Sequence, residues 1–268
     1  EEFGPKPFEE DETLTTIQNP GFETGDLTGW QLLGGNAFTA ANVIPSSQMH
    51  WEDRSAYAAG EFYLDGSNNG ATKESAVGAI RSSKFTLAGD GFISFMMGAG
   101  NGDSYVAIVD AETEEELMKI KNDSFSDPAR ALTLIRTYVD ASDYLNKVLY
   151  LKVVDANDAE GGFAFLNVDD FHVSLTKAEA SALAVAQLES VQAETYTSAK
   201  YDDLNMIRDF YLNYDYPFTL DSLVMSQYIP AKVSAYPATL DLNAYLAEAE
   251  AKFGDTVVEG LEIRKVTF

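Results

Sequence analysis

Phe92-Ile-Ser-Phe-Met-Met-Gly-Ala-Gly-Asn-Gly-Asp-Ser-Tyr-Val-Ala-Ile-Val-Asp110 places two apolar runs, 92–97 and 105–110, on either side of a glycine-rich turn. Short runs rich in β-branched and aromatic residues are typical of strands, and glycine, asparagine and aspartate are typical of the turns between them. Further runs at 148–154 and 163–175 enclose a loop of the same polar composition. The region from Ile17 to about Thr176 therefore predicts an all-β sandwich.

After Thr176 the apolar residues recur at spacings of three and four, which indicates amphipathic helices. Three helices are predicted, around Ala184, Leu188 and Val191, around Leu204, Ile207 and Tyr211, and around Leu242, Leu246 and Phe253. We expect a flexible lead-in at 1–13, a sandwich at 14–176, and a smaller α-helical segment at 177–268 that ends in a short strand or hairpin. The acidic opening residues are not a signal peptide.

The composition excludes several classes of function. Among 268 residues, 43 are acidic and 18 basic, and the net charge of −25 opposes binding to nucleic acid and to anionic lipid. No cysteine is present, so thiol catalysis and cysteine-based metal sites are excluded. No stretch approaches the roughly 20 apolar residues of a spanning helix, so membrane insertion is not expected.

A series of motifs, in order along the chain, carries a family resemblance. The motifs are Asn19-Pro-Gly-Phe-Glu-Thr-Gly-Asp-Leu-Thr-Gly-Trp30, Gly60-Glu-Phe-Tyr-Leu-Asp-Gly66, Glu74-Ser-Ala-Val-Gly-Ala-Ile-Arg-Ser-Ser-Lys-Phe85, Ile93-Ser-Phe-Met-Met-Gly-Ala-Gly-Asn101, Tyr105-Val-Ala-Ile-Val-Asp-Ala111, Val153-Val-Asp155 and Asn167-Val-Asp-Asp-Phe171. Over about 14–176, this set resembles the family 66 carbohydrate-binding modules, which accompany glycoside hydrolase family 32 enzymes. One departure is Glu160-Gly-Gly-Phe-Ala-Phe165, where related sequences often carry a tryptophan.

The resemblance implies a jelly-roll sandwich that is not an enzyme by itself. It further implies recognition of terminal fructosyl units of β-fructans such as levan and inulin, a linked catalytic domain, and an extracellular or cell-surface location on a bacterium. The catalytic motifs of family 32, Asn-Asp-Pro-Asn-Gly, Arg-Asp-Pro and Glu-Cys, are absent. Two alternatives stay open: a structural or adhesive sandwich that serves as a spacer, and an incomplete hydrolase.

Two side chains, Glu74 and Arg81, are the centre of the expected sugar site, because they match positions that are regular in the family. A guanidinium and a carboxylate read adjacent hydroxyls by paired hydrogen bonds. Asn101 would add an amide that both donates and accepts, and Arg136 would add a second guanidinium. Trp51 and Tyr63 are candidates for stacking on a sugar ring, whereas Trp30 is expected in the core. For the arginines, a surface ion pair is the alternative.

A calcium site is expected at Glu23 with Asp169 and Asp170. Related jelly-roll modules often hold a structural calcium between the opening turn and the final strand, and calcium prefers carboxylate and carbonyl oxygens. Strand alternation puts Asp169 on the face of its apolar neighbours, from Phe163 to Val173, where a buried carboxylate needs a partner. A hydrogen-bonded turn without metal is the alternative.

Overall fold

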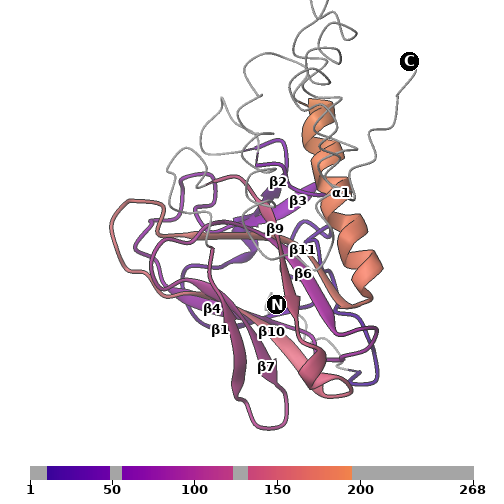
Figure 1. Ribbon diagram of the computed structural model, residues 1–268. Coiled ribbons are helices and arrows are strands. Elements are labelled where there is room, and N and C mark those ends of the chain that lie inside the picture. The colour runs from indigo at the N-terminus through magenta and orange to yellow at the C-terminus, as the bar shows by residue number, and fades with distance from the viewer. Residues whose placement is uncertain (1–10, 49–55, 123–131, 195–268) are drawn as a thin grey trace, which may run out of the picture.

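The computed structural model describes residues 11–48, 56–122 and 132–194, which form two antiparallel β-sheets and one α-helix (Figure 1). The predicted β-sandwich is thus confirmed. The strands are β1 Trp30–Gly35, β2 Val43–Pro45, β3 Phe62–Asp65, β4 Gly78–Ser82, β5 Phe85–Thr86, β6 Phe92–Ala99, β7 Tyr105–Asp110, β8 Glu116–Ile120, β9 Ile135–Asp140, β10 Val148–Asp155 and β11 Leu166–Leu175, and the helix is α1 Lys177–Glu194. Short 3₁₀ turns lie at Ala40–Asn42 and Ser142–Tyr144.

The two sheets combine strands that are far apart in sequence. Sheet A has the order β1-β4-β10-β7-β8, with β5 paired to β10, and sheet B has the order β2-β3-β11-β6-β9. The run expected at 105–110 is β7, and those at 92–97 and 148–154 are extended by two residues and one residue in β6 and β10. The last strand begins at Leu166 instead of 163, because the backbone still turns through positive φ at Gly162 and Phe163.

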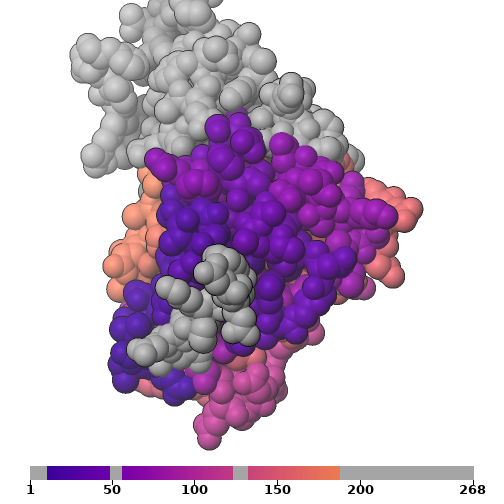
Figure 2. Space-filling view, turned by 180° about the vertical axis from the view of Figure 1, so that it is seen from behind, coloured from indigo at the N-terminus to yellow at the C-terminus, as the bar shows by residue number. Residues whose placement is uncertain are grey.

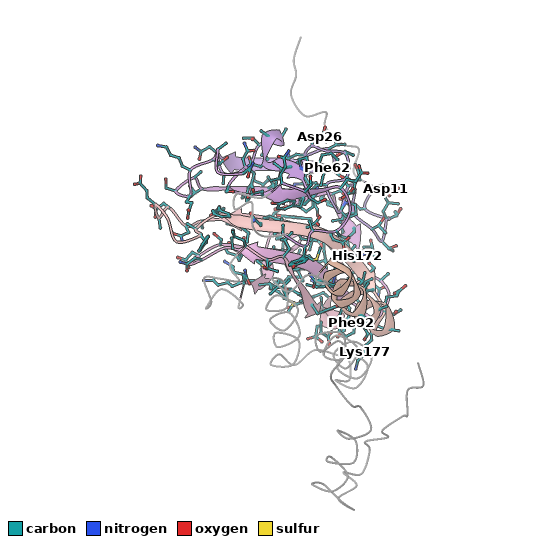
Figure 3. The ribbon with its side chains drawn as sticks, turned by 90° about the horizontal axis from the view of Figure 1, so that it is seen from above. Asp11, Asp26, Phe62, Phe92, His172 and Lys177 are labelled. Carbon is teal, nitrogen blue, oxygen red and sulfur yellow. The ribbon has the colours of Figure 1, made fainter. Side chains whose placement is uncertain are left out.

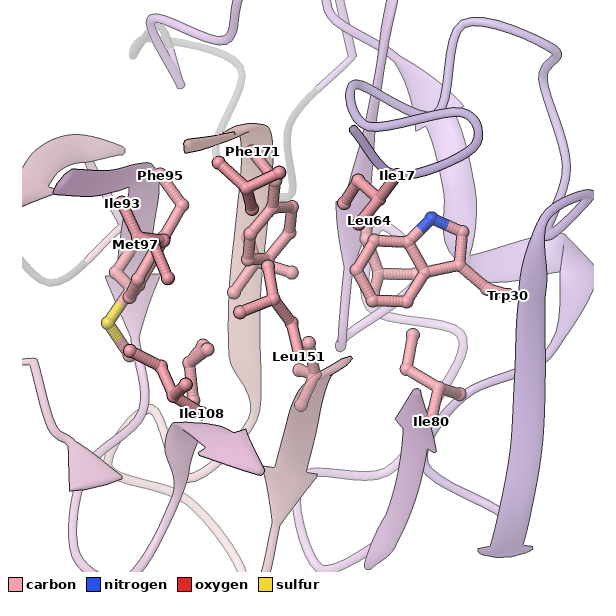
Figure 4. Packing of buried hydrophobic residues seen from close by; sticks show 14 of the residues in the cluster. Ile17, Trp30, Leu64, Ile80, Ile93, Phe95, Met97, Ile108, Leu151 and Phe171 are labelled. Atoms are coloured by element: carbon pink, nitrogen blue, oxygen red, sulfur yellow. The ribbon is translucent and has the colours of Figure 1, made fainter. Parts of the chain in front are cut away.

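A continuous apolar core lies between the sheets. Figure 4 shows Trp30, Ile80, Leu151 and Phe171 converging from both layers. Trp30 stacks on Phe22 with ring centroids 5.1 Å apart, and its Nε1 donates to the carbonyl of Asn19 at 3.0 Å. Trp30 is 2% exposed, so its predicted place in the core is confirmed. Seen from behind, the sandwich is covered mainly by N-terminal residues, indigo to purple in Figure 2.

Strand β11 departs from the simple alternation that the sequence indicates. Phe163 and Phe165 belong to a cluster outside the sandwich core, whereas Phe171 and Val173 belong to the core itself. The pairing of β11 with β6 shifts register between Asp169 and His172, where Asp170 has a φ of +49°. The expectation that every second residue from Phe163 to Val173 shares one face is therefore wrong, because a bulge changes the side to which side chains point.

The helix α1 begins directly after the last strand and packs on sheet B. Thr176 caps it: its Oγ1 accepts from the Glu179 amide, while the Glu179 carboxylate accepts from the Thr176 amide and hydroxyl. Ala180 is buried against Phe92 and Leu175. The first of the three predicted helices is confirmed, and the other two, with the C-terminal strand, lie outside the described residues. No helix in the described ranges is long and apolar enough to cross a bilayer.

At the other end of the chain, residues 11–14 lie along β5. The Thr86 amide donates to Leu14 O at 2.7 Å, and Lys84 forms an ion pair with Glu12 at 2.7 Å. The last residues of the predicted lead-in are therefore attached to sheet A in this structure. Residues 1–10 lie outside the described residues.

Candidate functional site

Glu74 and Asn101 meet on one glycine-bearing segment, residues 161–164, at one end of the sandwich. The carboxylate of Glu74 accepts from the Ala164 amide at 3.1 Å, and the side-chain amide of Asn101 donates to Gly162 O at 3.2 Å. The backbone of Asn101 also donates to Phe163 O at 3.1 Å. Both side chains are partly exposed. Of the residues expected in the sugar site, Glu74 and Asn101 therefore contact the same segment.

The loop that carries Asn101 needs glycine on both sides. Gly100 and Gly102 have φ of +80° and +83°, and a Cβ on Gly102 would meet Asn157 Nδ2 at 2.7 Å. That amide donates to the Asn101 carbonyl at 2.6 Å and so fixes the loop. Asn157 is not among the residues that the sequence predicted for the site. The sequence feature that could have indicated it is a side-chain amide in the polar loop that follows β10.

These groups can read sugar hydroxyls. One carboxylate can accept several hydrogen bonds, so the Glu74 carboxylate retains acceptor capacity beyond the bond from Ala164. An amide both donates and accepts, which suits a hydroxyl that does the same. The arrangement suits hydrogen-bonded recognition of a polyol at the loop end.

The buried carboxyl group of Asp155 is connected to segment 161–164 through Ser104. Ser104 Oγ donates to Asp155 Oδ1 at 2.8 Å and reaches Ala164 O at 3.4 Å. Asp155 is 2% exposed, and burial raises its pKa to about 6 despite the hydrogen bond from Ser104. Because its side chain is enclosed, we assign Asp155 to positioning the loop and not to contact with a ligand.

Arg81 belongs to another surface. It lies on β4, its Nε donates to Gln31 Oε1 at 2.7 Å, and its guanidinium lies over the Tyr150 ring, 5.3 Å from the centroid. Gln31 and Tyr150 belong to β1 and β10, so these contacts hold Arg81 on the outer face of sheet A. The structure does not bring Arg81 onto the segment that holds Glu74 and Asn101.

Arg136 is buried at 3% exposure and forms a structural ion pair. Its guanidinium pairs with the carboxylate of Asp170 and donates to Ser94 Oγ at 3.1 Å, while its backbone amide donates to Gln187 Oε1 of α1 at 3.0 Å. His172 completes the cluster, with Nε2 2.9 Å from Asp170 Oδ1, and lies on the side of the sandwich that α1 covers (Figure 3). The ligand role predicted for Arg136 does not agree with this burial, because the helix packs over its strand.

The aromatic candidates give no stacking platform in the described residues. Tyr63 is fully buried with Met96 and Phe165, and its hydroxyl donates to Gln48 O at 3.1 Å. The expectation that Tyr63 stacks on a sugar is therefore wrong. Trp51 lies outside the described residues.

Two of the three predicted calcium ligands, Glu23 and Asp169, both lie close to Gly21. A Cβ built on Gly21 would be 3.7 Å from Glu23 Oε1 and 3.8 Å from Asp169 Oδ1. Asp169 is fully buried, and burial, followed by the negative charge of Asp170, raises its pKa well above the ordinary value; Glu23 adds to the same effect. A cation between Glu23 and Asp169 would relieve this repulsion.

The third predicted ligand points elsewhere, because the carboxylate of Asp170 is held by Arg136 and His172. Among the described residues, no group of three or more acidic or histidine side chains could hold a metal ion. A calcium ion would thus take two carboxylates and complete its shell with carbonyls. Backbone amides also satisfy both groups: Glu61 donates to Glu23 at 2.9 Å and Ala59 to Asp169 at 2.8 Å. The hydrogen-bonded turn without metal remains the alternative.

No family model matches the sequence, and no curated protein matches it. Solved structures with a similar sandwich include the carbohydrate-binding module TmCBM61 in complex with beta-1,4-galactotriose, at 15% identity over 58% of this chain and 94% of that chain, with a TM-score of 0.35. A family 35 carbohydrate-binding module from an environmental isolate is 13% identical over 55% of this chain and 89% of that chain, with a TM-score of 0.30.

The K3 adhesin domain of Lys-gingipain from Porphyromonas gingivalis W83 is similar to the same degree, at 14% identity over 60% of this chain and 99% of that chain, with a TM-score of 0.33. At these scores the likeness carries no argument about function.

Proposed function

We propose that this chain is a noncatalytic carbohydrate-binding module that recognises terminal fructosyl units of β-fructans such as levan and inulin. The observation that carries the proposal is the meeting of Glu74 and Asn101 on residues 161–164, where both side chains are partly exposed. The ordered motifs shared with family 66 modules support the choice of fructan. In this role, the module would hold a linked family 32 hydrolase on its substrate outside the cell or at its surface.

Recognition would rest on hydrogen bonds and not on ring stacking. Glu74 accepts from two sugar hydroxyls, and the Asn101 amide donates to a neighbouring one. Each hydrogen bond replaces one with water, so the net gain is modest and the affinity of a single shallow site is low.

Replacing Glu74 by glutamine is expected to weaken levan binding about tenfold, which corresponds to about 1.4 kcal/mol. The variant keeps the side-chain shape but exchanges one charged acceptor for a donor. Calorimetric titration with levan, inulin and sucrose measures the effect. Glu160→Gln is the matched control, because Glu160 is an exposed carboxylate in the neighbouring loop. Absence of heat with all three sugars, together with binding to an unrelated glycan or protein, would favour the spacer alternative.

We also propose a structural calcium ion between Glu23 and Asp169, held by these two carboxylates and neighbouring carbonyls. Calcium at ten times its Kd is expected to stabilise the chelator-treated protein by about 1.4 kcal/mol, or about 3–6 °C in Tm. Thermal unfolding with and without calcium measures the shift, with magnesium as the ionic control. Asp169→Asn should abolish the shift. An equal shift in the variant would place the ion elsewhere.

A further inference from the structure

The outer face of sheet A carries a row of four long polar side chains and one alanine that runs across five strands. The backbone register aligns, in order, Gln31 of β1, Arg81 of β4, Lys152 of β10, Ala107 of β7 and Lys119 of β8. We call these five residues the sheet A row. Neighbouring strands lie about 4.8 Å apart, so the three cations of the row span most of the width of the sheet.

Aromatic rings and one carboxylate hold these cations in place. The Arg81 guanidinium lies 5.3 Å from the Tyr150 centroid, and Lys119 Nζ lies 4.6 Å from the Tyr105 centroid. Glu116 is shared between Lys119 at 2.7 Å and Lys152 at 2.6 Å. A side chain that is already fixed loses less entropy when a ligand arrives, so the sheet A row is preorganised for binding.

The charge of the sheet A row contrasts with that of the chain. The whole chain carries a net charge of −25, whereas the row holds three cations against two carboxylates: the shared Glu116, and Glu114, which accepts from the Tyr150 hydroxyl at 2.6 Å. At about 0.15 M salt the screening length is about 8 Å, so distant acidic residues act weakly here and the local excess of positive charge dominates. The surface therefore selects a ligand with negative groups.

We propose that the sheet A row binds an acidic polysaccharide, a chain of uronate-type sugars that lies across the strands. The fork of a guanidinium matches a carboxylate, which favours Arg81 as its principal contact. Strand spacing is comparable to the length of one sugar residue, so successive or alternate carboxylates can reach Arg81, Lys152 and Lys119.

Other features agree with a charged and not an aromatic contact. Tyr150 is 5% exposed and Arg81 covers its ring, so its face is not presented to a sugar. Nucleic acid is disfavoured because the long phosphate backbone would extend beyond the row toward the acidic remainder of the molecule. This second surface is independent of the loop site at Glu74, because Arg81 and Glu74 serve different contacts.

The test compares two double variants with the wild type at about 0.15 M salt, where distant charges are screened. Arg81→Gln with Lys119→Gln removes two cations of the row. Lys84→Gln with Lys147→Gln is the matched control, because it removes the same charge from two other ion pairs, with Glu12 and Asp110. The probes are polygalacturonate, levan, double-stranded DNA and polyglutamate, titrated by calorimetry.

We expect polygalacturonate to bind the wild type, and to bind the Arg81/Lys119 variant about tenfold or more weakly. The Lys84/Lys147 variant should bind as the wild type does, and levan affinity should be equal in all three proteins. No binding of polygalacturonate to the wild type, or equal losses in both variants, overturns the proposal. Equal binding of DNA or polyglutamate overturns its restriction to sugars. If the wild type binds polygalacturonate but not levan, the proposed fructan site at Glu74 is contradicted and the proposal for the sheet A row stands.

Discussion

Replacing Asp170 by asparagine is expected to lower the free energy of unfolding by about 3–5 kcal/mol. Arg136, the partner of Asp170, is 3% exposed, so the variant leaves a buried guanidinium without its opposite charge. Asparagine is the suitable replacement, because Asp170 has a φ of +49° and asparagine tolerates that region well. The predicted loss therefore reports the charge and not the backbone.

Equilibrium urea unfolding measures this change, with Asp158→Asn as the control for loss of an exposed carboxylate. Arg136→Met combined with Asp170→Asn should recover part of the stability, because the pair is then removed as a unit. Burial opposes ionisation of Asp170, but the hydrogen bond with His172 and the charge of Arg136 lower its pKa to about 2. Its stabilising contribution should persist down to about pH 4 and disappear as the pH falls toward 2. A loss of less than 1 kcal/mol in Asp170→Asn would mean that the ion pair does not hold the sheet.

The stability that Asp155 contributes is expected to fall as the pH rises, whereas the contribution of Asp170 falls as the pH is lowered. Because burial raises its pKa to about 6, the folded state binds a proton that the unfolded state releases near pH 4. Stability should therefore fall by about 2–3 kcal/mol as the pH rises from about 4 to about 6. Unfolding by urea across this range, in the wild type and in Asp155→Asn, isolates the effect as a difference. Parallel curves for the two proteins would show that Asp155 ionises normally.

The Asp155 carboxyl matters for the site because Ser104 connects it to the segment that Glu74 holds. A conformational response of the loop to its ionisation should appear as a pH-dependent levan affinity that Asp155→Asn lacks. Ser104→Ala is the companion variant, because it removes the connection and leaves the carboxyl in place.

Strand positions could be predicted from the sequence because apolar alternation and glycine turns are local signals. The run 105–110 became β7 without change. The two faces of β11 could not be predicted, because the positive φ of Asp170 lies where the pairing of β11 with β6 shifts register, and a shift in pairing between distant strands has no local signal. Asp169 is held by the Ala59 amide, whereas Asp170 is held by Arg136 and His172.

The residues expected in the sugar site divide between local and long-range positions, and the expected centre, Glu74 with Arg81, is not formed. Glu74 and Asn101 follow turns whose composition marks a loop end, and they do meet there. Arg81 follows Glu74 closely in sequence but lies within a strand, and sheet neighbours decide where its side chain goes. The burial of Arg136 depends on Gln187 of α1, which lies beyond the segment that carries the family resemblance. Such long-range contacts have no local signal.

A crystal structure of the protein bound to a levan-derived oligosaccharide tests the central claim most directly. We predict that hydroxyls of a terminal fructosyl unit lie within hydrogen-bonding distance of the Glu74 carboxylate and the Asn101 side-chain amide, beside residues 161–164. Sugar bound only at the sheet A row, or at any place remote from Glu74 and Asn101, would contradict the proposed function.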